Sequence, residues 1–440
     1  MQEYFHRLAD IVGSSLCGDE VYTSAFFSED TDFVRFNHGD VRQAGHVVQR
    51  EMALDLINGR RHAAANITIS GDIEEDRARL EAAVGQLREN YAALPEDPYL
   101  LYAMEPQSTE RQGEDHLPDA PAAVARIREA GQGRDLVGVY AAGGMYRGFA
   151  NSFGQRNWFA AHSYNFDWSF YHTADKAIKS SYAGFVWDPG AFEHKIAWAC
   201  EQSAVLRKPA RTIKPGRYKV YLSPVAVYDL VSLLGWDGFG LKSHRTKQTP
   251  LLKMVSGDAR LHPSVSIGEN TRDGGAPNFQ EAGFLRPDNV PLIENGAYRD
   301  CLVSPRSAQE YGVPTNGAAA EELPESIDVA PGQVPMAEAL HELDTGVYIG
   351  NLWYLNYSDR NACRTTGMTR FATFWVEHGV VQEPLNVMRF DETFYRALGE
   401  NLTGLTTERE FILDPETYSR RSTRSGRVPG ALIEDFTFTL

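Results

Sequence analysis

The sequence predicts an α+β protein, with helices packed on an antiparallel sheet in its N-terminal region and a β-rich C-terminal domain. Two helix-like segments flank strand-like runs in the first 94 residues, and a strand leads directly into a capped helix near residue 220. Short strands separated by turns follow residue 292. At 440 residues the chain exceeds one ordinary domain. We therefore expect an N-terminal α/β domain at 1–94, a middle α/β region at 95–214 and the β-rich domain at 215–440.

The N-terminal domain is predicted as helix, sheet and helix. Apolar residues at helical spacing indicate a helix over residues 1–12. Strands are expected from Thr31 to Ser70, with a hairpin at Asn58-Gly59, because this dipeptide suits a two-residue turn. A second helix is expected from the N-cap Asp72 to about Tyr91.

The middle region follows a polar, Pro-containing connector. A short helix is predicted from Asp119 to about Ala130. Residues 136–172 are rich in strand formers and predict an antiparallel meander, with turns at Gly143-Gly144 and at Asn151 to Gly154. Asp188-Pro189 then begins another helix.

The stretch from Gly216 to Gly240 is the best-defined local signal in the chain. Tyr218 to Leu222 has the composition of a short strand. Ser223 is a good N-cap, Pro224 a good first helical residue, and Gly235 a C-terminal stop after an apolar stripe. A strand that leads into a capped helix is a common way to present a catalytic or metal-binding helix.

The rest of the C-terminal domain is predicted as many short strands. Turns are expected at Glu294 to Gly296 and at Glu377 to Gly379. The segment from Ser243 to Arg286 has few apolar runs and many Gly, Pro and polar residues, which predicts a long loop. Long loops in compact proteins are often functional.

Charge and composition limit the classes of partner. The net charge of -16 argues against a nucleic-acid-binding surface, and the basic run Arg420 to Arg427 is interpreted as an intramolecular or subunit contact. The four scattered cysteines, Cys17, Cys200, Cys301 and Cys363, indicate a reducing compartment. The amphipathic N-terminus is not a signal sequence, and no apolar run approaches the length of a membrane span. We expect a cytoplasmic protein that binds neither nucleic acid nor membranes.

Histidines and cysteines offer few candidates for chemistry. His341-Glu342 begins like a zinc-peptidase motif, but no second histidine follows at the required spacing, so an ordinary helix-end histidine is predicted. His244 and His262 flank the long loop and can meet in space, although solvated loop histidines are favoured. Cys301 and Cys363 can be nucleophiles in principle, but small buried residues are favoured.

The segment from Gly350 to Gly379 alternates aromatic residues with amides and charges. We single out Tyr354, Asn356, Arg360 and Arg370. A groove that grips an extended peptide would use such residues, with amides and guanidinium groups for backbone carbonyls and aromatic rings for side chains. A dimer interface would use them equally well. The segment is therefore a candidate for substrate binding or for partner contact.

Several dispersed segments occur in the order expected of one protein family. They are FVRFNHGDVRQAGHVVQREMALDLINGRR, GMYRGFANSFGQR with its A-N-S-x-G run, RPDNVPLIENGAYRDCLVSPRSAQEYGVPTNG and the closing strand from Gly426 to Phe438. On these segments the chain resembles the TldD/PmbA family, whose members were once described as modulators of DNA gyrase. The resemblance covers nearly the whole chain and implies the family's fold, with a barrel-like C-terminal domain.

The resemblance also implies where a zinc site would lie. In that family the active subunit, TldD, carries H-E-x-x-x-H on a helix after a strand, and a cysteine near the C-terminus completes the site. Laid without gaps on Val220 to Asp237, the histidines fall on Ser232 and Asp237 and the glutamate on Leu233. The cysteine region falls near Ser422 to Ser425. These residues cannot replace two imidazoles, a general base and a thiolate, so the chain resembles the TldE/PmbA class and is expected to hold no metal.

What the family implies is a heterodimeric zinc metallopeptidase that acts on unfolded peptides or leader peptides. Zinc is expected in the TldD-like partner, while this chain, itself inactive, completes the chamber and helps to bind an extended peptide. One alternative is a stand-alone homodimeric peptide-binding protein without peptidase activity. Another is a metal-independent hydrolase that uses Cys301 or Cys363.

Overall fold

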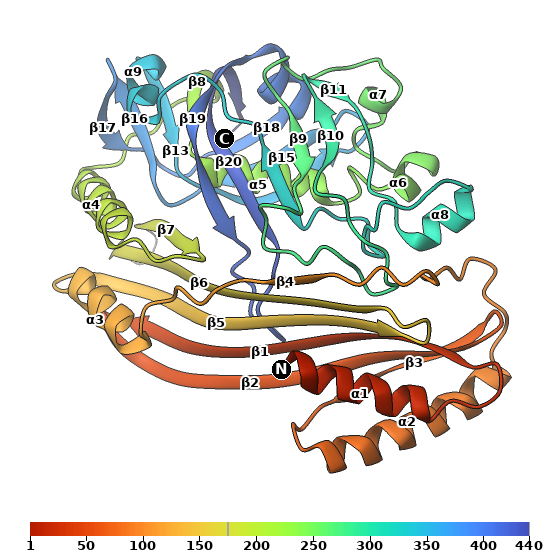
Figure 1. Cartoon of the computed structure of the whole chain (residues 1–440). Helices are drawn as coiled ribbons and strands as arrows, with labels where there is room; N and C mark the ends of the chain where they lie inside the picture. Colours follow the sequence, from red (N-terminus) through yellow and green to blue (C-terminus); the bar gives the residue numbers. More distant parts are fainter. Residues whose placement is uncertain (174–175, 440) are drawn as a thin grey trace.

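A computed structural model describes residues 1–173 and 176–439. Its N-terminal half is built on one large sheet, drawn in red to yellow in Figure 1, in which the strand order is β3-β2-β1-β5-β6-β4 and β7 pairs with β6. The strands are β1 Val21–Asn37, β2 Asp40–Asn58, β3 Arg61–Thr68, β4 Glu110–Gln112, β5 Asp135–Asn151, β6 Arg156–Thr173 and β7 Lys176–Gly184. All pairs are antiparallel except β4 with β6. The sheet therefore joins strands from both sides of the predicted boundary at residue 94, and that boundary stays a prediction.

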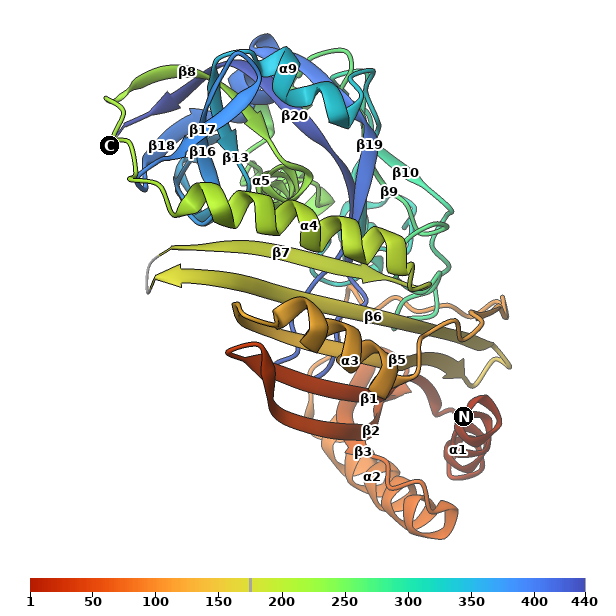
Figure 2. The ribbon, with the colours of Figure 1, turned by 90° about the vertical axis from the view of Figure 1, so that its left-hand side faces the viewer.

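Helices cover this sheet where the sequence predicts them. They are α1 Gln2–Ser14, α2 Ile73–Ala93, α3 Ala120–Gly131 and α4 Pro189–Leu206. Asp72 caps α2 by accepting from the N–H groups of Glu74 and Glu75, as expected. The helices α1 and α2 lie on the face away from the C-terminal domain (Figure 1), where Phe5 stacks on Phe26 with ring centroids 5.1 Å apart. The helix α4 lies between β7 and the C-terminal sheet (Figure 2).

Two predictions for this sheet need correction. The strands begin at Val21 rather than Thr31. The predicted turn at Gly143-Gly144 is wrong, because both residues lie inside the continuous strand β5. Glycine is needed there for close packing: a Cβ on Gly143 would lie 2.0 Å from the carbonyl oxygen of Asp30 on β1. The predicted turn near Asn151 is confirmed, and so is the antiparallel arrangement of β5, β6 and β7.

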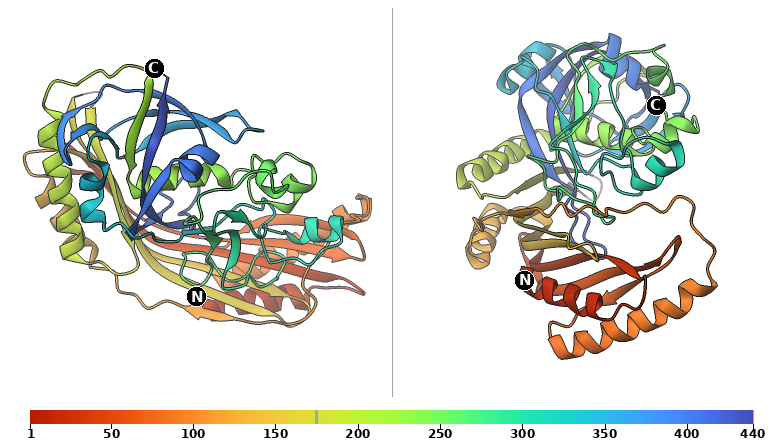
Figure 3. Two further views of the ribbon diagram at one scale, coloured as in Figure 1. Left: turned by 90° about the horizontal axis from the view of Figure 1, so that it is seen from above. Right: turned by 45° about the vertical axis from the view of Figure 1, so that its right-hand side comes forward.

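The C-terminal half is β-rich and barrel-like, as predicted. Its sheet curves around one helix (Figure 3). Its main strand order is β11-β10-β9-β12-β20-β8-β13-β16-β17, with β14, β15, β18 and β19 attached as branches. Its strands are β8 Gly216–Leu222, β9 Ile267–Glu269, β10 Val290–Glu294, β11 Ala297–Tyr298, β12 Ser326–Val329, β13 Gly346–Ile349, β14 Leu352–Asp359, β15 Arg364–Thr369, β16 Thr373–Glu377, β17 Val380–Pro384, β18 Arg389–Thr393, β19 Leu402–Leu413 and β20 Ser425–Phe438. The predicted turns between β10 and β11 and between β16 and β17 are confirmed.

Inside this sheet lies α5, Pro224–Gly235, whose buried apolar side chains form one core with those of β8, β13 and β20. The short helices are α6 Leu241–Arg245, α7 Leu252–Val255, α8 Pro305–Tyr311, η1 Met336–Glu338, α9 Ala339–Leu343 and η2 Arg396–Glu400. The predicted long loop contains α6, α7 and β9 and is otherwise irregular. Among the described residues, no helix has the length and apolar character needed to cross a membrane.

Residues 414–424 connect β19 to β20 and reach down to the N-terminal sheet; we call this segment the strut. The Arg420 guanidinium donates to Glu51 of β2 over 3.1 Å. Arg421 is 4% exposed, and its guanidinium donates to the Ser163 hydroxyl of β6 over 2.8 Å. The backbone N–H of Arg421 donates to Glu29 of β1. The basic run is therefore an intramolecular contact, one of the two readings that its sequence favoured.

Candidate functional site

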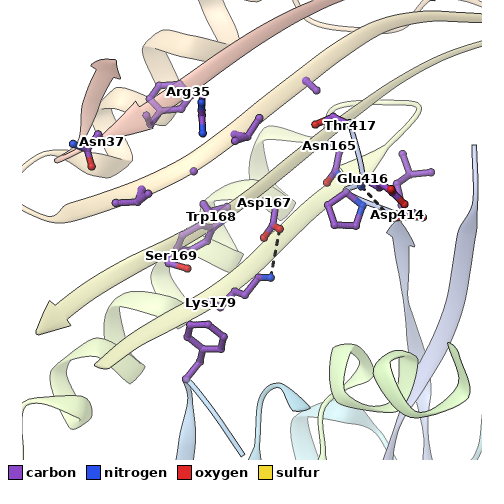
Figure 4. A pocket seen from close by; sticks show the side chains of 18 of the residues that line it. Arg35, Asn37, Asn165, Asp167, Trp168, Ser169, Lys179, Asp414, Glu416 and Thr417 are labelled. Carbon is purple, nitrogen blue, oxygen red and sulfur yellow. Dashed lines mark hydrogen bonds and ion pairs between the residues drawn. The ribbon is translucent and has the colours of Figure 1, made fainter. Parts of the chain in front are cut away.

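Two cavities lie between the N-terminal sheet and the C-terminal domain, one on each side of the strut. The first, which we call the Arg370 cavity, has a volume of about 470 Å³ and is shown in Figure 4. The second, the Arg147 cavity, has a volume of about 490 Å³. Their sheet walls come from opposite halves of β1 and β5: Arg35 and Val137 line the first, Phe27 and Arg147 the second. The strut contacts the middle of β1 between them, at Glu29.

The sheet wall of the Arg370 cavity presents alternate residues of β6 because side chains alternate between the faces of a strand. Asp167 points toward Lys179 of β7, and their charged atoms are 3.5 Å apart (Figure 4). Burial raises the pKa of the Asp167 carboxyl, and Lys179 opposes that rise. Asn165 is 8% exposed, and its Oδ1 atom has no hydrogen-bond partner among the described residues. A buried amide oxygen without a donor is a place where a ligand N–H group can bind.

The opposite wall comes from the C-terminal domain and carries one of the four residues that we singled out. The Arg370 guanidinium lies over the ring of Trp353, 4.7 Å from its centroid, and 5.2 Å from the centroid of Phe371. All three residues line the cavity. The cavity thus combines aromatic surface, hydrogen-bond acceptors on β6 and the positive charges of Arg370 and Lys179. A peptide backbone, which offers carbonyl and N–H groups alternately, suits such a lining.

The other three predicted residues lie elsewhere on the β14–β15 hairpin. Tyr354 is 78% exposed, and the exposed Asn356 side chain accepts a hydrogen bond from the N–H of Tyr357. Arg360 lies at the far end of the hairpin, where its guanidinium donates to Asp237 over 3.0 Å and to the backbone oxygen of Gln248 over 3.0 Å. The structure therefore does not gather the four into one site. Sequence reasoning missed Asn165, Asp167 and Lys179 because nothing local to the long strands indicates which positions face a cavity.

The helix α5 has the start that the sequence predicts. The Ser223 hydroxyl accepts from the N–H of Ala226 and donates to the backbone oxygen of Gly350. Of the three positions assigned to the lost zinc motif, Leu233 is 4% exposed. Asp237 lies beyond the helix end with a backbone φ of 60° and pairs with Arg360.

Burial raises the pKa of Tyr228, and the Ser232 side chain, one turn later on α5, opposes that rise. Among the described residues, no group of three or more His, Cys, Asp or Glu side chains could hold a metal ion. Of these positions only Asp237 carries a group that zinc accepts as a ligand, and that carboxylate pairs with Arg360. A catalytic zinc site needs three protein ligands, so the residues at these positions do not fit zinc.

The strut and the start of β20 lie beside α5, as the resemblance implies. A Cβ on Gly426 would lie 2.4 Å from the ring of Tyr228. The Ser425 hydroxyl accepts from the N–H of Gly275, and Ser422 lines the Arg370 cavity. The start of β20 therefore meets α5 at Gly426 and Tyr228, and the aligned positions carry no imidazole or thiolate group.

Comparison with protein-family models matches residues 215–440 to the PmbA/TldA metallopeptidase C-terminal domain. The chain belongs to this family. No curated protein sequence matches the chain.

Solved structures of similar proteins agree with this assignment and span the whole chain. A proposed modulator of a DNA gyrase from Thermotoga maritima MSB8 is 15% identical, covers 99% of this chain and 99% of its own, and superposes with a TM-score of 0.78. TldE from Thermococcus kodakarensis is 15% identical, covers 99% of this chain and all of its own (100%), with a TM-score of 0.78. A proposed modulator of DNA gyrase from Bacteroides thetaiotaomicron is 13% identical, covers 99% of this chain and 98% of its own, and superposes with a TM-score of 0.72. At these identities the likeness shows the fold.

One carboxyl group of this PmbA/TldD-family chain lies on α5, close enough to Asp167 and Lys179 to sense their charges. The Asp229 carboxylate accepts from the N–H of Leu352 over 3.0 Å. Burial raises the pKa of Asp229 to about 7, while the charges of Lys179 and Asp167 act on it in opposite directions. The helix α5 is therefore within electrostatic reach of the ion pair on β6 and β7.

The remaining histidine and cysteine candidates are structural. His341 lies near the end of the short helix α9, as predicted. His244 is half-buried rather than solvated, because its ring hydrogen-bonds to the backbone oxygen of Gly238 over 2.7 Å. Cys301 is 6% exposed and Cys363 0%, as predicted for small buried residues. Burial raises the pKa of both thiols, which disfavours the thiolate that a nucleophile needs.

Proposed function

We propose that this chain is the non-catalytic, TldE-like subunit of a heterodimeric TldD/TldE-type zinc metallopeptidase that acts on unfolded peptides or leader peptides. The zinc ion belongs to a TldD-like partner. This chain closes the chamber and binds part of the substrate as an extended strand. The observation that carries the proposal is α5: in a member of a metallopeptidase family, the middle of this helix is apolar, with Leu230, Val231 and Leu233 each less than 5% exposed.

The Arg370 cavity supports a role in substrate binding. It joins the aromatic surface of Trp353 to the acceptors on β6 and to the cations Arg370 and Lys179. Such a lining recognises backbone groups more than particular side chains, which suits a peptidase that accepts many unfolded sequences. Trp353, which lines the cavity, and the adjacent Tyr354 are 40% and 78% exposed and suit partner contact.

The first test is co-purification with a TldD-like protein, followed by zinc analysis and peptide cleavage by each chain alone and by the pair. We expect cleavage to require the pair and zinc to be retained by the partner. If this chain alone bound stoichiometric zinc and cleaved peptides in a chelator-sensitive manner, the proposal would be wrong. Peptide binding without any stable TldD-like partner would favour the stand-alone homodimeric binding protein instead.

The second test asks whether the Arg370 cavity binds substrate. Arg370→Ala in the reconstituted pair removes a charged donor for a peptide carbonyl group, and we expect KM for an unfolded peptide to rise roughly 10- to 100-fold, the range of a lost hydrogen bond to a charged group. Arg211→Ala is the matched control, because Arg211 lies 4.5 Å over Trp375 but is not among the residues that line the cavity. Equal KM values for the two variants would show that the Arg370 cavity does not bind the substrate.

A further inference from the structure

The second cavity contains a buried cation without a counter-ion. Arg147 on β5 is 8% exposed and lines the Arg147 cavity. Its Nη1 group donates to the backbone oxygens of Tyr146, over 2.9 Å, and Ser28, over 3.4 Å. Among the described residues, its Nε and Nη2 groups have no hydrogen-bond acceptor and no carboxylate forms an ion pair with it. Burying a charged group in this state is costly unless a partner arrives.

The carboxylates nearest to Arg147 are already engaged. Glu325 pairs with Arg286 over 2.6 Å, and Glu51 pairs with Arg420 over 3.1 Å. Glu29 accepts from Gln49 and from the backbone N–H of Arg421.

A second cation also lies close to Arg147. Arg147 and Arg420 both contact the ring of Phe27, at 5.3 Å and 4.0 Å from its centroid. The pKa of Arg147 is lowered to about 10, mainly by burial and secondly by the positive charge of Arg420. An anionic ligand beside Arg147 would stabilise its positive charge and raise its pKa again.

The rest of the cavity restricts the kind of anion. Aromatic side chains line it, among them the half-buried Phe27, whose ring contacts Arg147, and the half-buried Tyr99 and Tyr102. Five acidic side chains also line the cavity and would repel a dianion such as a phosphate monoester: Asp55, Asp97, Glu281, Glu321 and Glu325. A single carboxylate beside an apolar group meets both conditions, and the planar guanidinium fork matches a carboxylate geometrically. Glu281 and Glu321 are exposed, so the cavity opens to solvent.

We propose that the Arg147 cavity binds the free C-terminal carboxylate of a peptide whose last side chain is apolar. The carboxylate accepts from the free donors of Arg147, and the side chain packs on the half-buried rings of Phe27 and Tyr102, which line the cavity. This inference rests on the proposed function for the nature of the ligand, a peptide, but concerns a cavity on the other side of the strut from Arg370. Such a site would make this subunit prefer peptides that end in a free C-terminal carboxylate.

The test uses the full chain and two small probes, N-acetyl-L-phenylalanine and its C-terminal amide, with binding followed by calorimetry or NMR titration. They differ in the carboxylate alone, so we expect the acid to bind roughly 10- to 100-fold more tightly, as for a charge-assisted hydrogen bond. Equal binding of acid and amide to the unaltered chain would overturn the proposal without any variant.

Variants then assign the effect to one residue. Arg147→Gln should abolish the preference for the acid, and Arg147→Lys should keep part of it. Arg134→Gln is the matched control: the Arg134 guanidinium lies 5.6 Å over Phe170 and donates to the backbone oxygens of Ala130 and Gln132, yet it is not among the residues that line a cavity. A preference for the acid that survives in folded Arg147→Gln would overturn the proposal.

The same probes separate this proposal from the proposed function. If the reconstituted pair failed to cleave peptides while the acid probe still bound through Arg147, the peptidase assignment would fail and the carboxylate site would stand. If the pair cleaved free and amidated peptides with equal KM and the probes bound equally, only the carboxylate site would fail.

Discussion

Replacing Asp229 by Asn should stabilise the protein, and increasingly so as the pH rises. Burial raises the pKa of this carboxyl from 3.8 to about 7 in the folded chain. Asn keeps the carbonyl oxygen that accepts from the N–H of Leu352 but cannot ionise. The unfolded chain releases the Asp229 proton at lower pH than the folded chain does. The ionised carboxyl therefore lowers the free energy of unfolding as pH rises between the two pKa values.

The pKa difference corresponds to roughly 4 kcal/mol over the full range of pH. Between about pH 5 and about pH 8, we expect the stability advantage of Asp229→Asn to grow by roughly 2–3 kcal/mol. Burial also raises the pKa of Glu269 to about 7, but Glu269 titrates in both proteins, so its effect cancels in the difference.

The assay is urea denaturation of both proteins across this range of pH. Asp237→Asn serves as the control, because its side chain is 57% exposed and its ion pair with Arg360 lies at the surface. That variant should shift stability by less than about 1 kcal/mol, as exposed ion pairs do. If the curves of stability against pH for the unaltered protein and Asp229→Asn ran parallel, the reasoning about burial on α5 would be refuted.

Two further predictions concern the strut and the cysteines. Arg421→Met removes the buried hydrogen bonds to Ser163 and should lower the free energy of unfolding by about 2–4 kcal/mol, whereas Arg424→Met, whose side chain is 44% exposed, should cost less than about 1 kcal/mol. Equal costs in chemical denaturation would show that the strut does not hold the two halves together. Cys301→Ala together with Cys363→Ala should leave cleavage by the reconstituted pair unchanged, because both thiols are buried and protonated. Loss of activity in the folded double variant would restore the cysteine-hydrolase hypothesis.

Local chemistry was enough to predict the elements whose ends carry a strong signal. Ser223 and Pro224 fix the start of α5, and Asn58-Gly59 fixes the turn between β2 and β3. The turn predicted at Gly143-Gly144 is wrong because two adjacent glycines usually indicate a turn. Here the reason is close approach to β1 across the sheet, a contact between residues that are more than 100 positions apart.

The candidate sites depend on long-range contacts of the same kind. Arg370 was singled out because aromatic residues surround it in the sequence, and Trp353 and Phe371 do contact it. Arg147 sits in the segment GMYRGFAN and looks like any exposed arginine of a strand. Its burial without a counter-ion follows from where the strut lies, and the strut lies 270 residues later in the chain. No periodicity or spacing in the sequence contains that information.

The two cavities impose a length requirement on any ligand that fills both. Phe27 lines the Arg147 cavity and Arg35 lines the Arg370 cavity, and both belong to the same strand, β1. Eight residues of extended chain separate them, which corresponds to roughly 26 Å. A peptide that starts beside Phe27 and runs along β1 therefore needs about eight residues before it reaches Arg35, the β1 wall of the Arg370 cavity, and it must pass the strut at Glu29 and Arg421. A folded peptide cannot adopt this extended path, so the spacing of the cavities itself would select unfolded substrates.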